Sequence, residues 1–286
     1  MPATGGNEFV GEVLKKGEKV DKFVLNEHVI PYESGIGTWS KYLLLNEKQI
    51  YPIPFSLPLP EAATLTVNPC TAYRILKDFI KLRPGDCVVQ NGANSAVGQA
   101  VHQLCKLYGI KSVGIVRDRE DIVHLKQYLL RLGATEIFTE EELLKTKVFE
   151  GGCLPKPRLA LNCVGGESAH NIAKLLEHKG VMVTYGGMSR KPISINAANM
   201  IFKRHTFYGF WITDWVKRNA DTLERQVMLR DLVELSSSNS FKAPTHTLIP
   251  FEEYKKYAKK IMSFGHKSNQ KYIFDMTKKF EGSICA

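Results

Sequence analysis

The sequence predicts an α/β fold in which a doubly wound parallel sheet is combined with a smaller β-rich region. Between residues 87 and 211, short apolar segments alternate with amphipathic helical segments, a pattern typical of parallel sheets covered by helices on both faces. Before residue 68, short apolar runs are separated by Gly and Pro at a density that favours part of a small barrel. At 286 residues, the chain is long enough for one large or two ordinary domains.

The β-rich region is followed by a predicted helix. Asn68 is a good N-cap and Pro69 fits the first helical position, so a helix is expected to run on through 71–79. The side chain of Asn68 also has the donors and acceptors to hold a carboxamide, and the two roles are compatible. The strands expected before this helix are Phe9–Gly11, Val20–Leu25, His28–Pro31, Tyr42–Leu45 and Ile50–Phe55.

A turn of small residues joins the first predicted parallel strand, 88–91, to its helix, in which Val97, Val101 and Leu104 form one buried face. Small side chains let a phosphate approach the backbone, and the helix start offers it N–H groups and the positive end of a dipole. The glycine spacing departs from the usual dinucleotide fingerprint, so a purely structural strand–turn–helix remains an alternative. As a cofactor loop, the turn consists of Asn94, Ser95, Ala96 and Val97.

The next strand, 112–116, ends in Arg117, Asp118 and Arg119. This position, about 20 residues after the turn, is where dinucleotide folds contact the adenosine ribose. Guanidinium groups suit a 2′-phosphate because they pair with it through two parallel hydrogen bonds. The sequence therefore predicts NADPH rather than NADH, and the alternative is an ordinary solvated charged loop.

The rest of the chain continues the alternation of strands and helices. Ile122, Leu125, Leu129 and Leu132 predict a helix that ends at Gly133. A capping box, Thr139 with Glu142, predicts the start of the next helix. Further strands are expected at 137–138, 158–164, 181–185, 206–211 and 271–274, further helices at 166–176, 223–235 and 251–261, and a loop at 236–240.

Two segments at predicted strand ends are candidate ligand contacts. Tyr185, Gly186, Gly187 and Met188 follow one strand, and glycines there leave room for a ribose against the backbone. A tight turn that requires glycine torsions is the alternative. At the end of the last parallel strand, the adjacent aromatics Phe210 and Trp211 point to opposite faces, so at most one is simple core and the other could wall a cofactor or a subunit interface.

Composition excludes several classes of protein. The chain is 44% hydrophobic and 24% charged, as in globular proteins, and its net charge of +10 suits phosphate-rich ligands or an acidic partner. The lysines are not clustered into a nucleic-acid arm, and no apolar run reaches the roughly 18 residues that span a bilayer, so neither nucleic acid nor membrane is an expected partner. The six cysteines and eight histidines show no metal-ligand spacing, and no metal site is predicted.

Taken together, these residues resemble the mitochondrial 2-enoyl thioester reductases, zinc-free members of the medium-chain dehydrogenase/reductase superfamily. The resemblance extends to about residue 276 and implies a Rossmann domain at 71–212 and a discontinuous GroES-like barrel domain at 1–70 and 213–286. Its matching stretches are Gly5–Glu8, Gly37–Trp39, Val67–Arg74, Gln90–Val101, Val116–Arg119, Leu161–Gly166, Val183–Met188 and Gly209–Trp211.

The resemblance implies NADPH-dependent reduction of the C2=C3 bond of enoyl thioesters carried on acyl carrier protein or coenzyme A, as the last reduction of mitochondrial fatty-acid synthesis. It also implies a homodimer and a mitochondrial location, although the first residues resemble no presequence. By the resemblance, NADPH contacts fall on Asn68, Asn94, Ser95, Ala96, Val97, Arg117, Asp118, Arg119, Tyr185, Gly186, Gly187, Met188, Phe210, Trp211, Ile212, Thr213 and Lys271.

Three differences bear on the chemistry. Zinc-dependent relatives carry Gly-His-Glu where this chain has Gly6-Asn7-Glu8, and an amide is a poor zinc ligand. Ala96 replaces the family's glycine, which is a small change. The family's catalytic tyrosine lies in opening barrel strands that are expected upstream of Met1, so no catalytic residue is assigned. Two alternatives therefore remain: a truncated product that binds NADPH without turnover, and a related zinc-free quinone or alkenal reductase.

Overall fold

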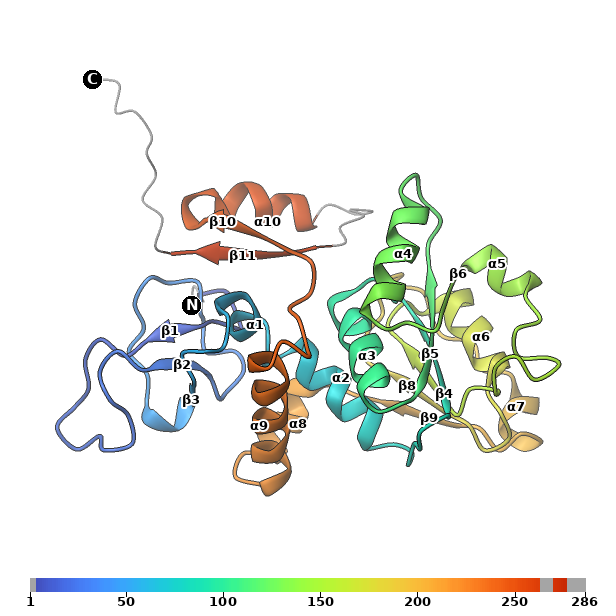
Figure 1. The fold of residues 1–286 in the computed structure, drawn as a ribbon, viewed down its shortest axis with the longest axis horizontal. Coiled ribbons are helices and arrows are strands. Elements are labelled where there is room, and N and C mark those ends of the chain that lie inside the picture. The colour runs from blue at the N-terminus through green and yellow to red at the C-terminus, as the bar shows by residue number, and fades with distance from the viewer. Residues whose placement is uncertain (1–3, 263–269, 277–286) are drawn as a thin grey trace, which may run out of the picture. The chain divides into compact units, whose positions relative to one another are not determined.

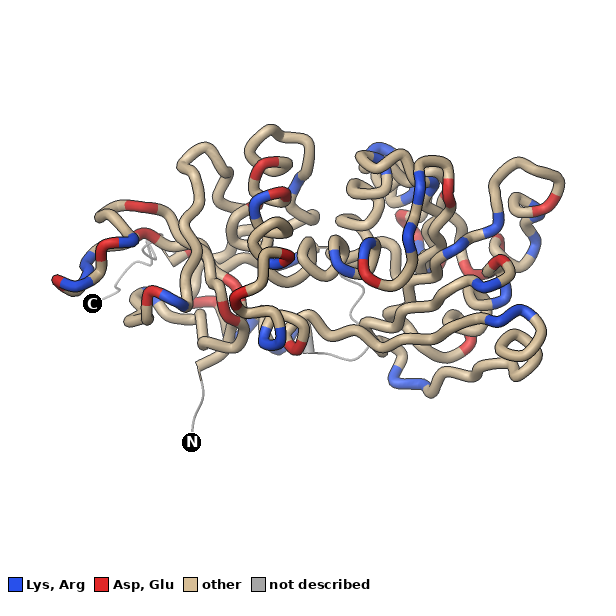
Figure 2. The backbone as a smooth tube through the Cα atoms, turned by 90° about the horizontal axis from the view of Figure 1, so that it is seen from below, with Lys and Arg blue, Asp and Glu red and all other residues tan. Residues whose placement is uncertain are grey.

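The computed structural model describes residues 4–262 and 270–276, and the chain divides into two compact units (Figure 1). One unit is continuous, Asn68–Trp215, and the other is formed by Met1–Val67 together with Val216–Ala286. The domain boundaries expected from the sequence, after residues 70 and 212, lie close to these two divisions. Lys and Arg are interspersed with Asp and Glu along the backbone of both units (Figure 2). No helix in the described ranges is long and apolar enough to cross a membrane.

The continuous unit is built on a six-stranded sheet with the order β6-β5-β4-β7-β8-β9, in which every neighbouring pair is parallel. The order runs outward in both directions from β4 and β7, so the sheet is doubly wound as predicted. Its strands are β4 (Cys87–Asn91), β5 (Lys111–Val116), β6 (Glu136–Thr139), β7 (Leu159–Asn162), β8 (Val181–Thr184) and β9 (Thr206–Gly209).

Helices cover both faces of this sheet because its strands are apolar on both sides. Val113 of β5 packs with Ile172 of α6 in one buried cluster, whereas the other cluster joins Val116 of β5 to Leu125 and Leu129 of α4. Residues of one strand thus pack alternately into the buried clusters on the two faces of the sheet. The helices of this unit are α2 (Asn68–Lys77), α3 (Ala96–Leu107), α4 (Ile122–Leu132), α5 (Glu140–Lys145), α6 (Gly166–Leu175), α7 (Ala197–Ile201) and α8 (Ile212–Arg218), whose last turn belongs to the other unit.

Local capping signals set the ends of these helices. α4 ends at Gly133, whose φ of 115° is a left-handed conformation that glycine adopts without strain. The predicted capping box is confirmed, since Thr139 accepts a hydrogen bond from the Glu142 N–H and the Glu142 carboxylate accepts one from the Thr139 N–H. The prediction for Asn68 was wrong by one position: α2 begins at Asn68, so this residue is helical and not the N-cap.

The discontinuous unit contains a three-stranded antiparallel sheet and a separate parallel pair, β10–β11. The strands expected at 20–25 and 42–45 do not form, and the helix α9 continues to Ser237 where a loop was expected. Its elements are β1 (Gly11–Glu12), β2 (His28–Pro31), the 3₁₀ helix η1 (Glu47–Gln49), β3 (Ile50–Ile53), α1 (Leu59–Ala63), α9 (Leu223–Ser237), β10 (His246–Pro250), the 3₁₀ helix η2 (Phe251–Glu253), α10 (Tyr254–Met262) and β11 (Lys271–Asp275).

Candidate cofactor site

The candidate site lies along the carboxyl ends of the parallel strands. Because the strands are parallel, their carboxyl ends share one edge of the sheet, where doubly wound folds bind ligands. The candidate segments follow directly: 94–97 after β4, 117–119 after β5, 185–188 after β8 and 210–213 after β9. Every sequence-predicted contact thus follows a strand of this sheet, except Asn68, which is in α2, and Lys271, which is in the discontinuous unit.

The turn after β4 has the close backbone packing that a phosphate site needs. A Cβ on Gly98 would lie 2.4 Å from the Ala93 carbonyl oxygen, so only glycine lets α3 approach the end of its strand this closely. Gly92 has a φ of +57°, and a Cβ there would lie 2.5 Å from the Cys163 Sγ. Ser95 caps α3 by accepting a hydrogen bond from the Gly98 N–H at 3.1 Å. Ala96 is the first helical residue of α3.

A buried hydroxyl group next to this turn completes no hydrogen bond in the part of the chain that the structure describes. The Tyr185 hydroxyl is inaccessible to solvent and completes no hydrogen bond within the described residues. The Cys163 and Ser95 side chains lie close enough to shift its pKa by weak hydrogen-bonding interactions, but neither meets the distance and angle of a full hydrogen bond. Burial and the neighbouring Cys163 raise the pKa of Tyr185 well above its usual value, so the group stays a protonated donor. A buried donor that completes no hydrogen bond costs about 1–3 kcal/mol.

The two arginines of the ribose position differ in their surroundings. Arg117, the first residue after β5, has an exposed side chain, as a 2′-phosphate contact requires. The Arg119 side chain is only 8% exposed and forms an ion pair with Asp121 at 3.5 Å. The Asp118 carboxylate accepts a hydrogen bond from the Arg119 N–H at 2.9 Å, which fixes the turn. Of the two guanidinium groups, that of Arg117 is therefore the exposed one.

Two large apolar side chains at the same edge are open to solvent. Trp211 is 66% exposed and Met188 is 79% exposed, which are surfaces that a bound ligand could cover. Phe210 instead packs edge-on against Phe79, with ring centroids 5.9 Å apart. Of the two adjacent aromatics, Phe210 therefore packs within the unit, and Trp211 remains the candidate contact. Ile212 and Thr213 form the first turn of α8.

The two remaining predicted contacts, Asn68 and Lys271, belong to elements other than the strands of this sheet. Asn68 is half-buried in the first turn of α2. Lys271, in the discontinuous unit, forms an ion pair with Glu8, whose other carboxylate oxygen accepts a hydrogen bond from the Val67 N–H at 3.0 Å. One carboxylate thus fixes both Lys271 and the residue before Asn68. The roles of Asn68 and Lys271 in cofactor binding remain predictions.

No group of three or more His, Cys, Asp or Glu side chains that could hold a metal ion occurs within the part of the chain that the structure describes. Asn7 stands at the position where zinc-dependent relatives have a ligand. Tyr32 and Tyr51, which match no catalytic motif, stack at 5.9 Å, and the guanidinium of Arg225 lies 3.5 Å from the ring of Tyr32. Their packing gives these tyrosines a structural role.

Sequence patterns missed two fully buried amides at the same edge, Asn91 and Asn162. Each is the last residue of its strand, and each hydrogen-bonds the backbone after β7. The available signal was an asparagine directly after an apolar run. That signal is weak, because asparagine is also common in turns.

Comparisons with known proteins agree with this geometry. The family model described as zinc-binding dehydrogenase matches residues 96–227. The mitochondrial enoyl-acyl-carrier-protein reductase of Xenopus tropicalis is 43% identical over 258 residues, which cover 89% of this chain and 73% of that protein. This chain belongs to the family of mitochondrial enoyl-acyl-carrier-protein reductases. The human member is 41% identical over 257 residues, or 89% of this chain and 68% of that protein.

Solved members of the enoyl reductase family have the same fold. The mitochondrial 2-enoyl thioester reductase Etr1p/Etr2p heterodimer of Candida tropicalis matches with a TM-score of 0.82 and 33% identity, over 91% of this chain and 78% of that one. A complex of Etr1p with NADP and crotonyl-CoA matches with a TM-score of 0.83 and 32% identity, over 90% and 77% of the two chains. A quinone reductase from Bacillus thuringiensis, described as an NADPH enzyme, matches at 22% identity with a TM-score of 0.79 and shows a shared fold only.

Proposed function

We propose that this chain binds NADPH and reduces trans-2-enoyl thioesters, on coenzyme A or acyl carrier protein, to saturated acyl thioesters in mitochondrial fatty-acid synthesis. The observation that carries the proposal is the convergence of the Gly98 close approach and the exposed Arg117 on one sheet edge. Family membership supports the thioester substrate, because relatives at this identity are named for that reaction.

The residues at this edge would hold each part of the cofactor. The first turn of α3, with Ser95 and Val97, would hold the pyrophosphate through N–H groups and the helix dipole. Arg117 would pair with the 2′-phosphate. Met188 and Trp211 would cover the nicotinamide half with apolar surface. When bound, NADPH supplies the hydride that reaches C3 of the enoyl thioester.

We also propose that two copies of this chain form a homodimer through the β9 end of the sheet. Among the described residues, β9 is the outermost strand of the sheet and pairs with β8 on one side only. Beside it in the chain, Met200, Ile201 and Phe202 are exposed, with Phe202 at 75%. An open strand edge next to apolar side chains favours pairing with another chain, and a relative of this family is known as a heterodimer of two related chains.

A substrate panel tests the proposed reaction. The purified chain is given NADPH together with crotonyl-CoA, an enoyl-acyl-carrier-protein or a quinone, and loss of NADPH is followed. We expect turnover with the enoyl thioesters at a kcat/KM at least tenfold above that with the quinone. A preference for the quinone would favour the alternative quinone reductase, and binding of NADPH without turnover on any substrate would favour a non-catalytic product.

A further inference from the structure

Two buried asparagines, Asn91 and Asn162, lie side by side where β4 and β7 end. Both are fully buried, and the Asn91 Nδ2 donates a hydrogen bond to the Asn162 Oδ1 at 2.8 Å. A buried amide is costly unless its polar atoms are paired, and here both side chains are satisfied. Their partners therefore indicate what the pair does.

The oxygens of both amides accept hydrogen bonds from one loop. The Asn91 Oδ1 accepts from the Cys163 N–H at 2.8 Å. The Asn162 Oδ1 accepts from the N–H groups of Val164 at 3.2 Å and Gly165 at 3.0 Å. Three successive backbone N–H groups after β7 are thus held by two side chains from inside the sheet.

The nitrogens of the two amides connect this loop to the next elements. Asn91 Nδ2 also donates to the Ser168 Oγ of α6 at 3.1 Å. The Ser168 Oγ in turn donates to the Glu140 carboxylate at 2.5 Å, and burial raises the pKa of Glu140. Asn162 Nδ2 donates to the Thr184 Oγ1 at the end of β8, at 3.1 Å.

The loop held by the asparagines forms backbone hydrogen bonds with the segment after β8. The Cys163 carbonyl accepts a hydrogen bond from the Met188 N–H at 2.9 Å, and the Val164 carbonyl accepts one from the Ser189 N–H at 2.9 Å. A Cβ on Gly186 would lie 3.2 Å from Cys163, so the two backbones pack directly together. The position of residues 185–188 therefore follows the position of 163–165.

We infer that Asn91 and Asn162 are positioning residues for the cofactor, holding the 163–165 loop and, through it, the 185–188 segment in the conformation that accepts the nicotinamide half of NADPH. The inference rests on the proposed function. Neither side chain contacts the cofactor. Both side chains act through hydrogen bonds to the backbone of the 163–165 loop. Removing these side chains displaces the 163–165 loop and the 185–188 segment, and leaves the hydrogen bonds between the strands intact.

The test compares Asn162→Leu, which has a similar size but no acceptor, with Asn162→Asp, which keeps the acceptor oxygen. In the cofactor-free protein, amide hydrogen exchange at Val164 and Gly165 should accelerate at least tenfold in the Leu variant and remain near wild type in the Asp variant. The Kd for NADPH of the Leu variant should rise at least tenfold, a loss of about 1.4 kcal/mol. The matched control is Thr135→Val, which removes a side-chain acceptor of the Ser112 N–H in the same sheet, a bond of 3.0 Å, and should leave the Kd unchanged.

The inference fails if Asn162→Leu binds NADPH within twofold of wild type, or if Thr135→Val loses as much affinity as Asn162→Leu. Should the Leu variant not fold, Asn91→Ser, which shortens the acceptor of the Cys163 N–H, gives the same readouts with the same expected direction. Unchanged exchange and affinity in Asn91→Ser would overturn the inference. A wild-type chain that does not bind NADPH would instead overturn the proposed function, and the inference with it.

Discussion

At the scale of single residues, we propose that Arg117 determines which dinucleotide the site prefers. Its exposed guanidinium is the cation placed for a 2′-phosphate, since Arg119 is committed to Asp121. We expect Arg117→Gln to raise the Kd for NADPH about tenfold to a hundredfold while the Kd for NADH changes less than threefold, because a charge-assisted pair contributes about 1.5–3 kcal/mol. Arg131→Gln, an exposed change on α4, controls for net charge. Equal losses for both dinucleotides would contradict this role.

Gly98 allows the close packing of α3 against the end of β4. Alanine is favoured over glycine in a helix by about 1 kcal/mol. A Cβ here would nevertheless overlap the Ala93 carbonyl, and such overpacking costs about 1–3 kcal/mol. We expect Gly98→Ala to lower the free energy of unfolding in urea by about 1–2 kcal/mol and to weaken NADPH binding, because α3 must move away from β4. Gly209→Ala, where no atom lies within 4 Å of the added Cβ, should be neutral.

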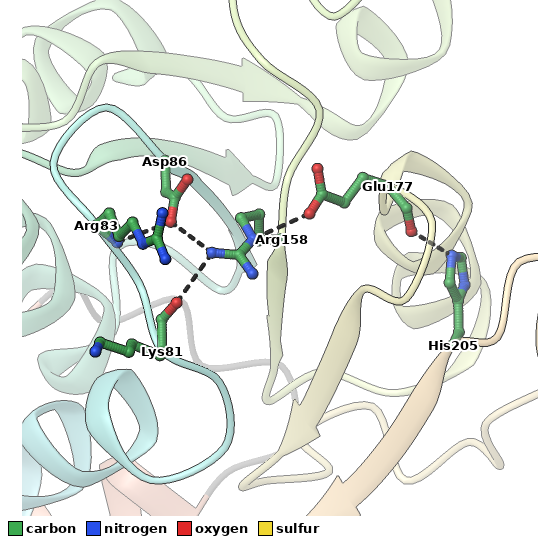
Figure 3. A network of polar contacts seen from close by, with 6 residues as sticks. All are labelled: Lys81, Arg83, Asp86, Arg158, Glu177 and His205. Carbon is green, nitrogen blue, oxygen red and sulfur yellow. Dashed lines mark hydrogen bonds and ion pairs between the residues drawn. The ribbon is translucent and has the colours of Figure 1, made fainter.

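At the scale of elements, one arginine joins the amino-terminal ends of the strands (Figure 3). The Arg158 guanidinium, just before β7, donates to the Lys81 carbonyl at 2.9 Å, to the Asp86 carboxylate at 2.8 Å and to the Glu177 carboxylate at 3.0 Å. The Glu177 carbonyl is itself bonded to the His205 ring at 2.9 Å, just before β9. This network lies at the edge opposite the candidate site, so it fixes the sheet without taking part in binding.

The network predicts a pH-dependent stability. Burial acts to raise the pKa of Asp86, but hydrogen bonds from the Arg158 side chain and the Arg83 N–H outweigh it and hold this pKa below its usual value. A lowered folded-state pKa stabilises the fold above the unfolded-state pKa of about 3.9, and the contribution is lost as pH falls through the folded value. Arg158→Met should therefore lower the free energy of unfolding by about 1 kcal/mol at pH 7, since the pair of Arg158 and Asp86 is partly exposed. The difference in unfolding free energy between the variant and wild type should become smaller below about pH 4. Urea unfolding across pH measures this, and a constant difference would refute it.

At the scale of the whole molecule, the proposed homodimer forms through the β9 end of the sheet. We expect the chain to sediment as a dimer. Phe202→Glu should raise the dimer dissociation constant at least tenfold, because a carboxylate would have to lose its water at an apolar interface. Leu144→Glu places the same charge on the exposed face of α5 and should leave the dimer intact. A dimer that tolerates Phe202→Glu would place the interface elsewhere.

The sequence predicted those parts of the fold that depend on local signals. The parallel sheet, the Gly133 helix end and the capping box at Thr139 each follow from residues a few positions apart. The β-rich region was predicted less well, because strand pairing depends on distant partners. Val24 and Leu44, in runs expected to be strands, are exposed. The helix α9 extends beyond residue 235, where it was expected to end, because Leu232 and Ser236, four residues apart, are both buried.

The candidate site was predicted to a similar extent. Arg117 and the turn before α3 followed from spacing, because the dinucleotide pattern is itself a local strand–turn–helix signal. Asn91 did not, since the Cys163 N–H that it holds is distant in the chain. Asn162 did not, because an asparagine after an apolar run is also common in turns. Nor could the sequence tell that Arg119 is engaged with Asp121 while Arg117 remains exposed.

The most direct test of the central claim is NADPH oxidation by the purified 286-residue chain with crotonyl-CoA, run beside NADPH binding on the same sample. The account predicts saturable NADPH binding, a weaker affinity for NADH, and conversion of crotonyl-CoA to butyryl-CoA with one NADPH consumed per product. Binding without conversion would support the cofactor site and contradict the reductase activity of this chain. Absence of NADPH binding would contradict both.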